Sequence, residues 1–239
     1  MKGVKEEMRH EVVKKAFAKT IPVMAGYLVL GIGFGILLHD AGYGTLWALA
    51  MSLLIYAGSM QYVGAGLLAG GASIIMTLIT TIMVNARHLF YSISMINRYK
   101  NERRYKPYLI FALTDETYSL LCNDDLSVTE DISLYRFLVS VFDQSYWVIG
   151  SVIGSILGSV LPFSTKGIEF SMTALFVASF VEQWITMDDH IPAFTGLLST
   201  LVCLIIFGPD SFLIPSMLVI TLVLTIFRKR LDPESEAGI

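Results

Sequence analysis

Charged side chains are scarce in this sequence, and the scarcity is concentrated in long stretches. Asp, Glu, Lys and Arg make up only 15% of the 239 residues, whereas soluble domains carry about 25%. Between Ile21 and Ala86 the one formally charged residue is Asp40, and about 20 apolar residues suffice to cross a bilayer. The composition excludes an ordinary soluble domain and predicts a single membrane domain over residues 1–239.

Cysteine is also rare, and the motifs of common enzymes are missing. Cys122 and Cys203 lie far apart at apolar positions, which excludes a disulfide framework and a cysteine metal site. The sequence has no Gly-x-Ser-x-Gly, no His-Glu-x-x-His, no phosphate loop and no dinucleotide fingerprint. We therefore expect no enzyme, no cofactor and no metal site.

Eight apolar segments follow one another along the chain, separated by short stretches rich in glycine, proline and aspartate. Such residues end helices and form turns, so the sequence predicts α-helices joined by short loops. The segments run over residues 21–38, 46–69, 72–95, 107–122, 136–161, 168–187, 191–207 and 212–227.

Lysine and arginine gather beside apolar segments, in 1–20, 98–106 and 228–230. This placement favours a topology signal over nucleic-acid binding, and such loops mark the cytoplasmic side of a membrane. We expect 1–20 to form a cytoplasmic amphipathic segment and 228–239 a cytoplasmic tail. The acidic loop 123–133 is expected outside, between a first repeat at 21–122 and a second repeat at 134–227.

A glycine-rich pattern in the first segment recurs in the fifth at a constant offset, as Tyr27, Gly31 and Gly35 against Tyr146, Gly150 and Gly154. These glycines predict faces where helices pack closely. The charge rule requires an even number of crossings before residue 98 and an odd number after the acidic loop. One segment in each half should then fail to cross, which makes the halves antiparallel, as in secondary transporters with inverted repeats.

The predicted fold is thus an all-α polytopic membrane helix bundle with two inverted repeats of four apolar segments each. It has about 6–8 spanning helices and one broken or re-entrant segment per half, around 57–61 and around 179–183. Two ordinary helices and one violated charge rule remain the alternative.

Polar side chains follow one side of the third segment at helical spacing. Asn85 and His88 fall in one stripe and Arg87 in the adjoining stripe. Polar and ionisable side chains are costly inside a bilayer and usually face a partner or a cavity. Arg87 either does the same or extends to the cytoplasmic headgroups.

Two adjacent acids, Asp115 and Glu116, stand among leucines in the fourth segment. Either would pair with Arg87 or His88 if the third and fourth segments are antiparallel neighbours. Such a pair handles protons or substrate, or it is a static ion pair that fixes helix packing.

Further candidates for a substrate or coupling site lie in other segments. Gln61 stands in the second segment, and Glu182 and Gln183 stand in the sixth. Asp143 lies near the start of the fifth segment, where the outer membrane interface is the expected position for a carboxylate.

The motifs of the chain resemble a known family when taken together. The most specific are Ala57-Gly58-Ser59-Met60-Gln61-Tyr62, Asn85-Ala86-Arg87-His88 and Leu113-Thr114-Asp115-Glu116, with Asp143 before Tyr146-Trp147. Over nearly its whole length the chain resembles the AzlC-type large subunit of branched-chain amino acid exporters.

The resemblance implies export of branched-chain and related small hydrophobic amino acids, together with a small membrane subunit of the AzlD type. We expect a multi-pass secondary exporter of the bacterial cytoplasmic (inner) membrane, driven by protons. Arg87 would bind the substrate carboxylate, and Asp115 or Glu116 would bind the ammonium or carry the proton. A non-transporting membrane scaffold or a channel-like protein is the alternative.

Overall fold

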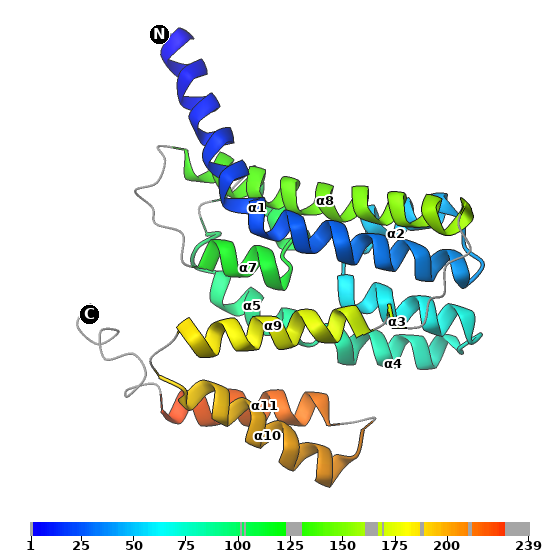
Figure 1. Cartoon of the computed structure of the whole chain (residues 1–239). Helices are drawn as coiled ribbons and strands as arrows, with labels where there is room; N and C mark the ends of the chain where they lie inside the picture. The colour runs from blue at the N-terminus through cyan, green and yellow to red at the C-terminus, as the bar shows by residue number, and fades with distance from the viewer. Residues whose placement is uncertain are drawn as a thin grey trace. The chain divides into compact units, whose positions relative to one another are not determined.

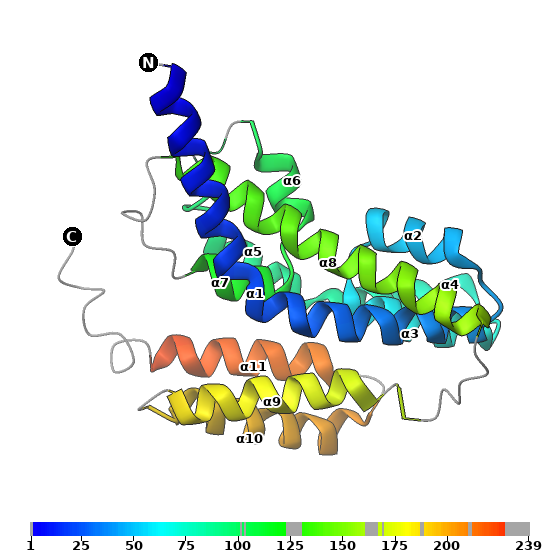
Figure 2. The same ribbon diagram turned by 45° about the horizontal axis from the view of Figure 1, so that its top comes forward.

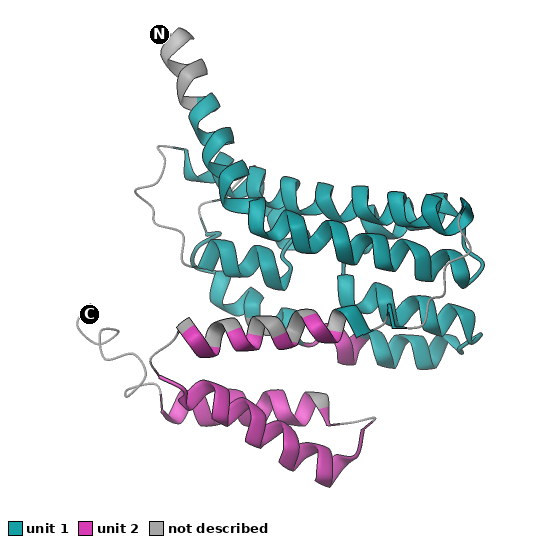
Figure 3. Ribbon diagram, in the orientation of Figure 1, with its two compact units in different colours: residues 1–81, 87–172 teal, residues 82–86, 173–239 magenta. Residues whose placement is uncertain are grey.

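Every element in the described part of the chain is an α-helix, as predicted. The computed structural model describes residues 2–100, 102, 104–122, 131–160, 167–168, 170–186, 189–209 and 212–227. The chain divides into two compact units (Figure 3). Unit 1 comprises residues 1–81 and 87–172, and unit 2 comprises residues 82–86 and 173–239.

Unit 1 contains most of the helices (Figure 1). They are α1 (Lys2–Asp40), α2 (Thr45–Leu54), α3 (Gly58–Ala69), most of α4 (Ile74–Asn85), α5 (Arg87–Met95), α6 (Lys106–Phe111), α7 (Asp115–Cys122) and α8 (Ile132–Val160). Unit 2 holds most of α9 (Phe170–Thr186), with α10 (Ile191–Phe207) and α11 (Leu213–Ile226).

In the part of the chain that the structure describes, two helices are long and apolar enough to cross a membrane: the part of α1 from Arg9 to Asp40, with 32 residues, and α8, with 29 residues. The helices α4 and α5 make a third if they are counted as one span, bent by 41° at their break. The helices α2, α10 and α11 are apolar but shorter. Since about 20 residues cover the hydrocarbon core, length and composition suit insertion in a membrane. The number of spans stays a prediction.

Helix α1 is longer than the sequence suggested. We expected residues 1–20 to form a separate amphipathic segment, but the helix runs without interruption from Lys2 to Asp40 and includes Pro22. A proline inside a helix removes one backbone hydrogen bond and bends the helix rather than necessarily ending it. Figure 1 shows α1 changing direction along its course.

The core of unit 1 is the close pair of α1 and α8 (Figure 2). Added Cβ atoms show how closely the backbones approach: one on Gly31 would lie 2.9 Å from the Trp147 carbonyl oxygen, and one on Gly154 would lie 2.6 Å from Ile32 Cα. Small residues permit such contacts between membrane helices. The glycines predicted as packing faces therefore form this interface.

The helices α1 and α8 run in the same direction. The ring of Phe17 contacts that of Phe142 near the beginning of the pair, and a Cβ on Gly158 would lie 3.1 Å from His39 Cβ near its end. Inverted halves would place these corresponding segments antiparallel. The inverted-repeat prediction is therefore at odds with the structure, because the charge rule counted crossings without knowing which segments turn back.

Two broken segments form helical hairpins in unit 1. The chain leaves the helix between Leu54 and Gly58, beside the predicted break at 57–61, so that α2 and α3 are separate helices. Helix α2 begins at Thr45, whose hydroxyl accepts a hydrogen bond from Ser155 near the end of α8. Helix α3 packs against α1, where Tyr62 donates to the Leu30 carbonyl oxygen at 2.6 Å, and Figure 1 shows α3 running back toward the end of the unit at which α2 begins.

The second hairpin lies in a different segment from the one we predicted. Helix α9 continues through residues 179–183, whereas the fourth apolar segment breaks into α6 and α7. The Thr114 hydroxyl accepts a hydrogen bond from the Thr117 backbone N–H at 3.3 Å, and Asp115 and Glu116 occupy the first helical turn. A threonine cap followed by acids is a helix-start signal, which we had interpreted as the middle of a span.

One end of unit 1 is closed by a cluster of buried apolar residues, which are Val12, Ala16, Met95, Tyr99, Leu109, Leu113, Leu121, Tyr135 and Val139. The cluster joins α1, the end of α5, the α6–α7 hairpin and the start of α8. Beside it, Arg136 forms an ion pair with Glu102 at 3.1 Å and donates to the Arg98 carbonyl oxygen at 2.9 Å.

This cluster bears on the predicted sidedness of the loops. Tyr99, in the basic segment 98–106, and Val12, in the first part of α1, both belong to the cluster. Residues 123–130 of the acidic loop lie outside the described residues, as do Arg103 and the basic positions 228–230. Leu121 and Tyr135, which lie on either side of the acidic loop, belong to the cluster as well. The outer placement of the loop stays a prediction.

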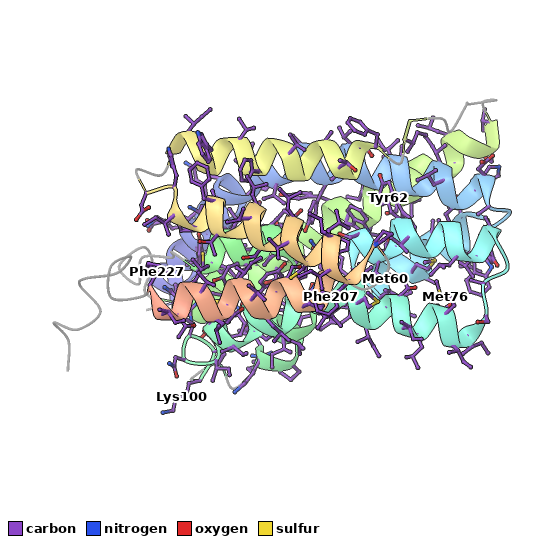
Figure 4. All side chains as sticks on the ribbon, turned by 90° about the horizontal axis from the view of Figure 1, so that it is seen from below. Met60, Tyr62, Met76, Lys100, Phe207 and Phe227 are labelled. Atoms are coloured by element: carbon purple, nitrogen blue, oxygen red, sulfur yellow. The ribbon has the colours of Figure 1, made fainter. Side chains whose placement is uncertain are left out.

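Unit 2 is apolar and simple in its connections. The helices α10 and α11 pack against each other as a hairpin, with Gly208 at a φ of 74° after α10. Their bounds agree with the seventh and eighth predicted segments. Figure 4 labels Phe207, at the end of α10, and Phe227, just after α11, and both side chains are exposed, as suits a surface that contacts lipid.

Candidate functional site

The two hairpins of unit 1 meet at the middle of α8. Gln144 in α8 accepts a hydrogen bond from Tyr108 of α6 at 2.6 Å. Its amide nitrogen donates to the carbonyl oxygen of Leu53, in α2, at 3.2 Å. One amide therefore fixes both hairpins to the same position on α8, because it has a donor and an acceptor at its end.

The breaks of the two hairpins also touch each other. Tyr56, in the α2–α3 break, lies 6.4 Å from Phe111 at the end of α6, measured between ring centroids. Tyr56 is buried and has a φ of 44°. A bulky residue with positive φ is strained by about 1–3 kcal/mol and persists only where its surroundings fix it. Such strain is frequent at functional sites.

Arg87 connects the first turns of two helices. Its guanidinium donates through Nη1 to Asp115, at the start of α7, and through Nη2 to Ser59, in the first turn of α3. The side chains of Arg87 and Asp115 are 23% and 28% exposed, so the pair is mostly enclosed. Arg87 is itself the first residue of α5, after the break at Ala86.

This arrangement concentrates positive potential at one place. The N-termini of α3 and α7 both face the guanidinium group of Arg87, and each helix N-terminus carries roughly half a positive charge. Asp115 supplies the opposing negative charge in the first turn of α7. Arg87 with the helix N-termini can therefore bind an anion, and Asp115 beside them can bind a cation.

Glu116 and Asp143 belong to one buried hydrogen-bond network. Tyr27 of α1 donates to Glu116 Oε2 at 2.7 Å, and its hydroxyl lies 2.6 Å from Thr114 Oγ1. Thr117 donates to Asp143 Oδ2 at 2.7 Å. We expected Asp143 at the outer interface, but it is fully buried in the middle of α8. The sequence shows how far Asp143 lies from the end of its segment. It does not show that the first turn of α7 covers this carboxylate.

The remaining predicted residues are less central. Gln61 is buried and accepts a hydrogen bond from Trp147 Nε1 at 2.9 Å, so it connects α3 to α8 rather than facing Arg87. His88 lies in the first turn of α5, with its ring centroid 5.6 Å from that of Tyr91. Asn85 is the last residue of α4 and belongs to unit 2. The side chains of Glu182 and Gln183 lie outside the described residues.

Sequence reasoning missed Tyr27, Thr117 and Tyr56. Tyr27 had a signal, since it begins the glycine pattern that recurs at Tyr146, but we had interpreted that pattern as packing only. Thr117 had another, because it stands three residues after the helix cap Thr114. Nothing in the sequence distinguishes Tyr56 from the other aromatic residues of the apolar segments.

Comparisons with known proteins agree on one family. The family model described as "AzlC protein" matches residues 22–161. The chain is 43% identical over 219 residues to the branched-chain amino acid transport protein AzlC of Bacillus subtilis, which covers 92% of this chain and 86% of that protein. It is 42% identical to an uncharacterized membrane protein of Helicobacter pylori, with 92% and 96% covered.

A third relative extends the match slightly. The chain is 41% identical over 230 residues to an uncharacterized membrane protein of Haemophilus influenzae, which covers 95% of this chain and 93% of that protein. No solved structure matches the chain. With a family model over more than half of its length and relatives that it covers almost completely, the chain belongs to the AzlC family.

Proposed function

We propose that this chain is the large subunit of a secondary exporter for branched-chain and related small hydrophobic amino acids. The name of the Bacillus subtilis relative supports the substrate class. The long apolar helices α1 and α8 support a multi-pass position in the bacterial cytoplasmic membrane, with about 6–8 crossings in all.

The observation that carries the proposal is the position of Arg87 between the N-termini of α3 and α7. An amino acid zwitterion has a carboxylate for the guanidinium and the helix N-termini, and an ammonium for Asp115. Guanidinium and carboxylate groups match geometrically and bind through two parallel hydrogen bonds. Helix N-termini at broken segments bind the carboxylate of amino acid substrates in other transporters.

A zwitterion can enter this site without leaving a charge unpaired. In the structure Arg87 and Asp115 neutralise each other. A bound amino acid would replace each partner with a group of the same charge, whereas a simple anion or cation would leave Asp115 or Arg87 enclosed without a partner. Breaking an enclosed pair in that way is strongly unfavourable, so the site selects zwitterions.

Proton coupling and a small AzlD-type membrane subunit complete the proposal. Two carboxylates within one network, Glu116 and Asp143, support the first, because acids buried in transporters commonly carry protons. The family resemblance supports the second. His88, Asn85, Gln61, Glu182 and Gln183 remain candidates for neutral or acidic contacts around the substrate path.

Cells loaded with dipeptides test the proposal directly. Cells with and without this chain, each also producing the small subunit, are compared for every amino acid that accumulates outside. We expect faster release of leucine, isoleucine and valine only where the chain is present. Equal release of every amino acid in both strains would refute the export function.

Variants of Glu116 and Asp115 separate transport from the alternatives. A membrane scaffold predicts that Glu116→Gln leaves release unchanged while the amount of assembled protein falls. A channel predicts that release stops when the outside and inside concentrations are equal. We expect instead that Glu116→Gln is produced normally and loses release, and that the wild-type chain raises the outside concentration above the inside one.

A further inference from the structure

Three hydroxyl side chains in unit 1 form a continuous hydrogen-bonded chain between two acids. Glu116 Oε2 lies 2.7 Å from the Tyr27 hydroxyl, which lies 2.6 Å from Thr114 Oγ1. Thr114 Oγ1 lies 3.2 Å from Thr117 Oγ1, which lies 2.7 Å from Asp143 Oδ2. Every step is within hydrogen-bonding distance, and the chain joins α1, the start of α7 and α8.

The two ends of this chain have different surroundings. Glu116 is half-buried and stands next to Asp115, which binds Arg87. At the other end, Thr117 and Asp143 have no exposed surface. Asp143 Oδ1 has no hydrogen bond with any residue that the structure describes, and Tyr56 and Tyr108 are the titratable groups of α2–α3 and α6 that lie near Asp143. One acid is thus next to the candidate substrate site and the other is enclosed.

The number of hydroxyl protons allows the chain to reverse its direction. Each hydroxyl has one proton to donate. Tyr27 donates to Glu116 and Thr117 donates to Asp143, so both ends accept. The single proton of Thr114 is left to face either Tyr27 or Thr117, both of which lie in range. The chain points toward Asp143 when Thr114 donates to Thr117 and the Tyr27 proton turns to Thr114. It points toward Glu116 when Thr114 donates to Tyr27 and the Thr117 proton turns to Thr114.

We propose that this chain is a proton relay between Glu116 and Asp143, which deepens the proposed proton-coupled function and rests on it. Protonated Glu116 donates to Tyr27, Tyr27 to Thr114, Thr114 to Thr117, and Thr117 to Asp143. Each hydroxyl loses one proton and gains one, one O–H bond breaks at Glu116, and one forms at Asp143. The relay then points in the opposite direction and is ready for the return transfer.

Electrostatics favours one proton shared by the two acids. Two ionised carboxylates in an enclosed, apolar place are costly, and a group so placed tends to become neutral. Arg87 already forms an ion pair with Asp115, and in the described part of the chain neither Glu116 nor Asp143 forms an ion pair of its own. A proton on either acid removes most of the cost, and the hydroxyl chain lets it move from the substrate side to the enclosed side.

Infrared spectroscopy of the purified full chain tests the relay without any substrate. The C=O stretch of a protonated buried carboxyl shifts when its proton is exchanged for deuterium, and its absence in Asp143→Asn assigns the band to Asp143. After a rapid change to heavy water, we expect the band to shift at least about tenfold more slowly in Thr117→Val than in the wild type. Thr117→Ser, which keeps the hydroxyl, should exchange at the wild-type rate.

Tyr27→Phe removes a hydroxyl of the same hydrogen-bonded chain on a different helix, and it should slow the exchange as Thr117→Val does. The relay can therefore still be tested if one of the two variants fails to fold. Equal exchange rates in both variants and the wild type would overturn the relay. The absence of any protonated-carboxyl band that depends on Asp143 or Glu116 would overturn it as well.

Flux in vesicles connects the relay to transport. In vesicles that contain the chain and its small subunit, Thr117→Val should lose most of the leucine movement that a proton gradient drives. It should keep exchange of labelled leucine for unlabelled leucine, which needs no net proton transfer. Loss of both activities in Thr117→Val alone would place the hydroxyl in the substrate site and refute the relay. A wild-type chain with no leucine flux would refute the proposed function, while the infrared result would still decide the relay.

Discussion

The hairpins α2–α3 and α6–α7 have the same backbone design and different chemistry. Each breaks in the middle of an apolar segment, and each restarts a helix in contact with Arg87, through Ser59 in one and Asp115 in the other. Near its break the first hairpin has only neutral polar groups, such as Gln61, whereas the second has two adjacent acids, Asp115 and Glu116. Similar architecture therefore supports unequal roles.

The difference indicates what each hairpin contributes. Non-helical backbone at membrane depth persists only where protein or water satisfies its polar groups. Gln144 binds the Leu53 carbonyl oxygen of the first hairpin and holds the second hairpin through the Tyr108 hydroxyl. With their positions fixed by the same residue, the remaining contrast lies in charge. We infer that α2–α3 sets the geometry of the site, and that α6–α7 supplies the groups that bind ammonium and protons.

The largest effect is expected where both hairpins depend on one interface. Gly154→Ala would place a Cβ against the backbone of Ile32, 2.6 Å from its Cα, so α1 and α8 would have to separate. Overpacking commonly costs about 1–3 kcal/mol, and more where backbone must move. We expect a marked fall in the thermal unfolding midpoint of the purified protein and loss of transport.

Gly66→Ala is the matched control, because a Cβ there meets nothing within 4 Å. Alanine is the better helix former by about 1 kcal/mol, so this variant should be as stable as the wild type or more so. An unfolding midpoint for Gly154→Ala equal to that of the control would show that the close contact of α1 and α8 is absent.

Replacing the arginine that both hairpins share should come next in size. Arg87→Lys keeps the charge but not the planar fork that reaches Ser59 and Asp115 together. We expect leucine release to fall to about a tenth or less of the wild-type rate. Arg98→Lys makes the same change outside the site, and it should leave release unaffected. Normal release from Arg87→Lys would remove the guanidinium from the mechanism.

Much of this site could be predicted from the sequence, because ionisable residues that are costly to bury stand out within its apolar segments. An arginine and adjacent acids in apolar segments require partners, and the expected pairing of Arg87 with one of them is present as the Arg87–Asp115 ion pair. The all-helical fold and the glycine faces followed from composition and spacing. Segment bounds followed as well, as in α10.

The rest depended on long-range contacts that spacing does not encode. The direction of α8 relative to α1 follows from which segments turn back, and the turn at Thr114 is a capping signal of a few residues inside an apolar run. Asp143 reaches the network only because α7 packs over it. A single sequence shows that a carboxylate is present but does not show which hydroxyl faces it.

The two partners of Arg87 compare the hairpins most directly. Asp115→Asn removes a charge-assisted hydrogen bond, and such bonds are roughly twice as strong as neutral ones. We expect about a tenfold loss of leucine release from Asp115→Asn, and about a twofold loss from Ser59→Ala, whose hydroxyl is neutral. Each variant differs from the wild type in a single functional group, so their initial rates of leucine release can be compared at equal protein levels. Equal losses would contradict the unequal roles of the hairpins.

The smallest effect is expected inside the neutral hairpin. Ser52 is buried in α2, and its hydroxyl accepts from Gln61 Nε2 at 3.4 Å, which is long for a hydrogen bond. Ser52→Ala should lower the free energy of unfolding by no more than about 0.5 kcal/mol and leave transport intact, because Gln61 keeps its stronger contact with Trp147. The measurements are thermal unfolding and initial release rate. If Ser52→Ala remained folded but lost most of its leucine release, α2–α3 would have a chemical role. The proposed division of roles between the two hairpins would then be wrong.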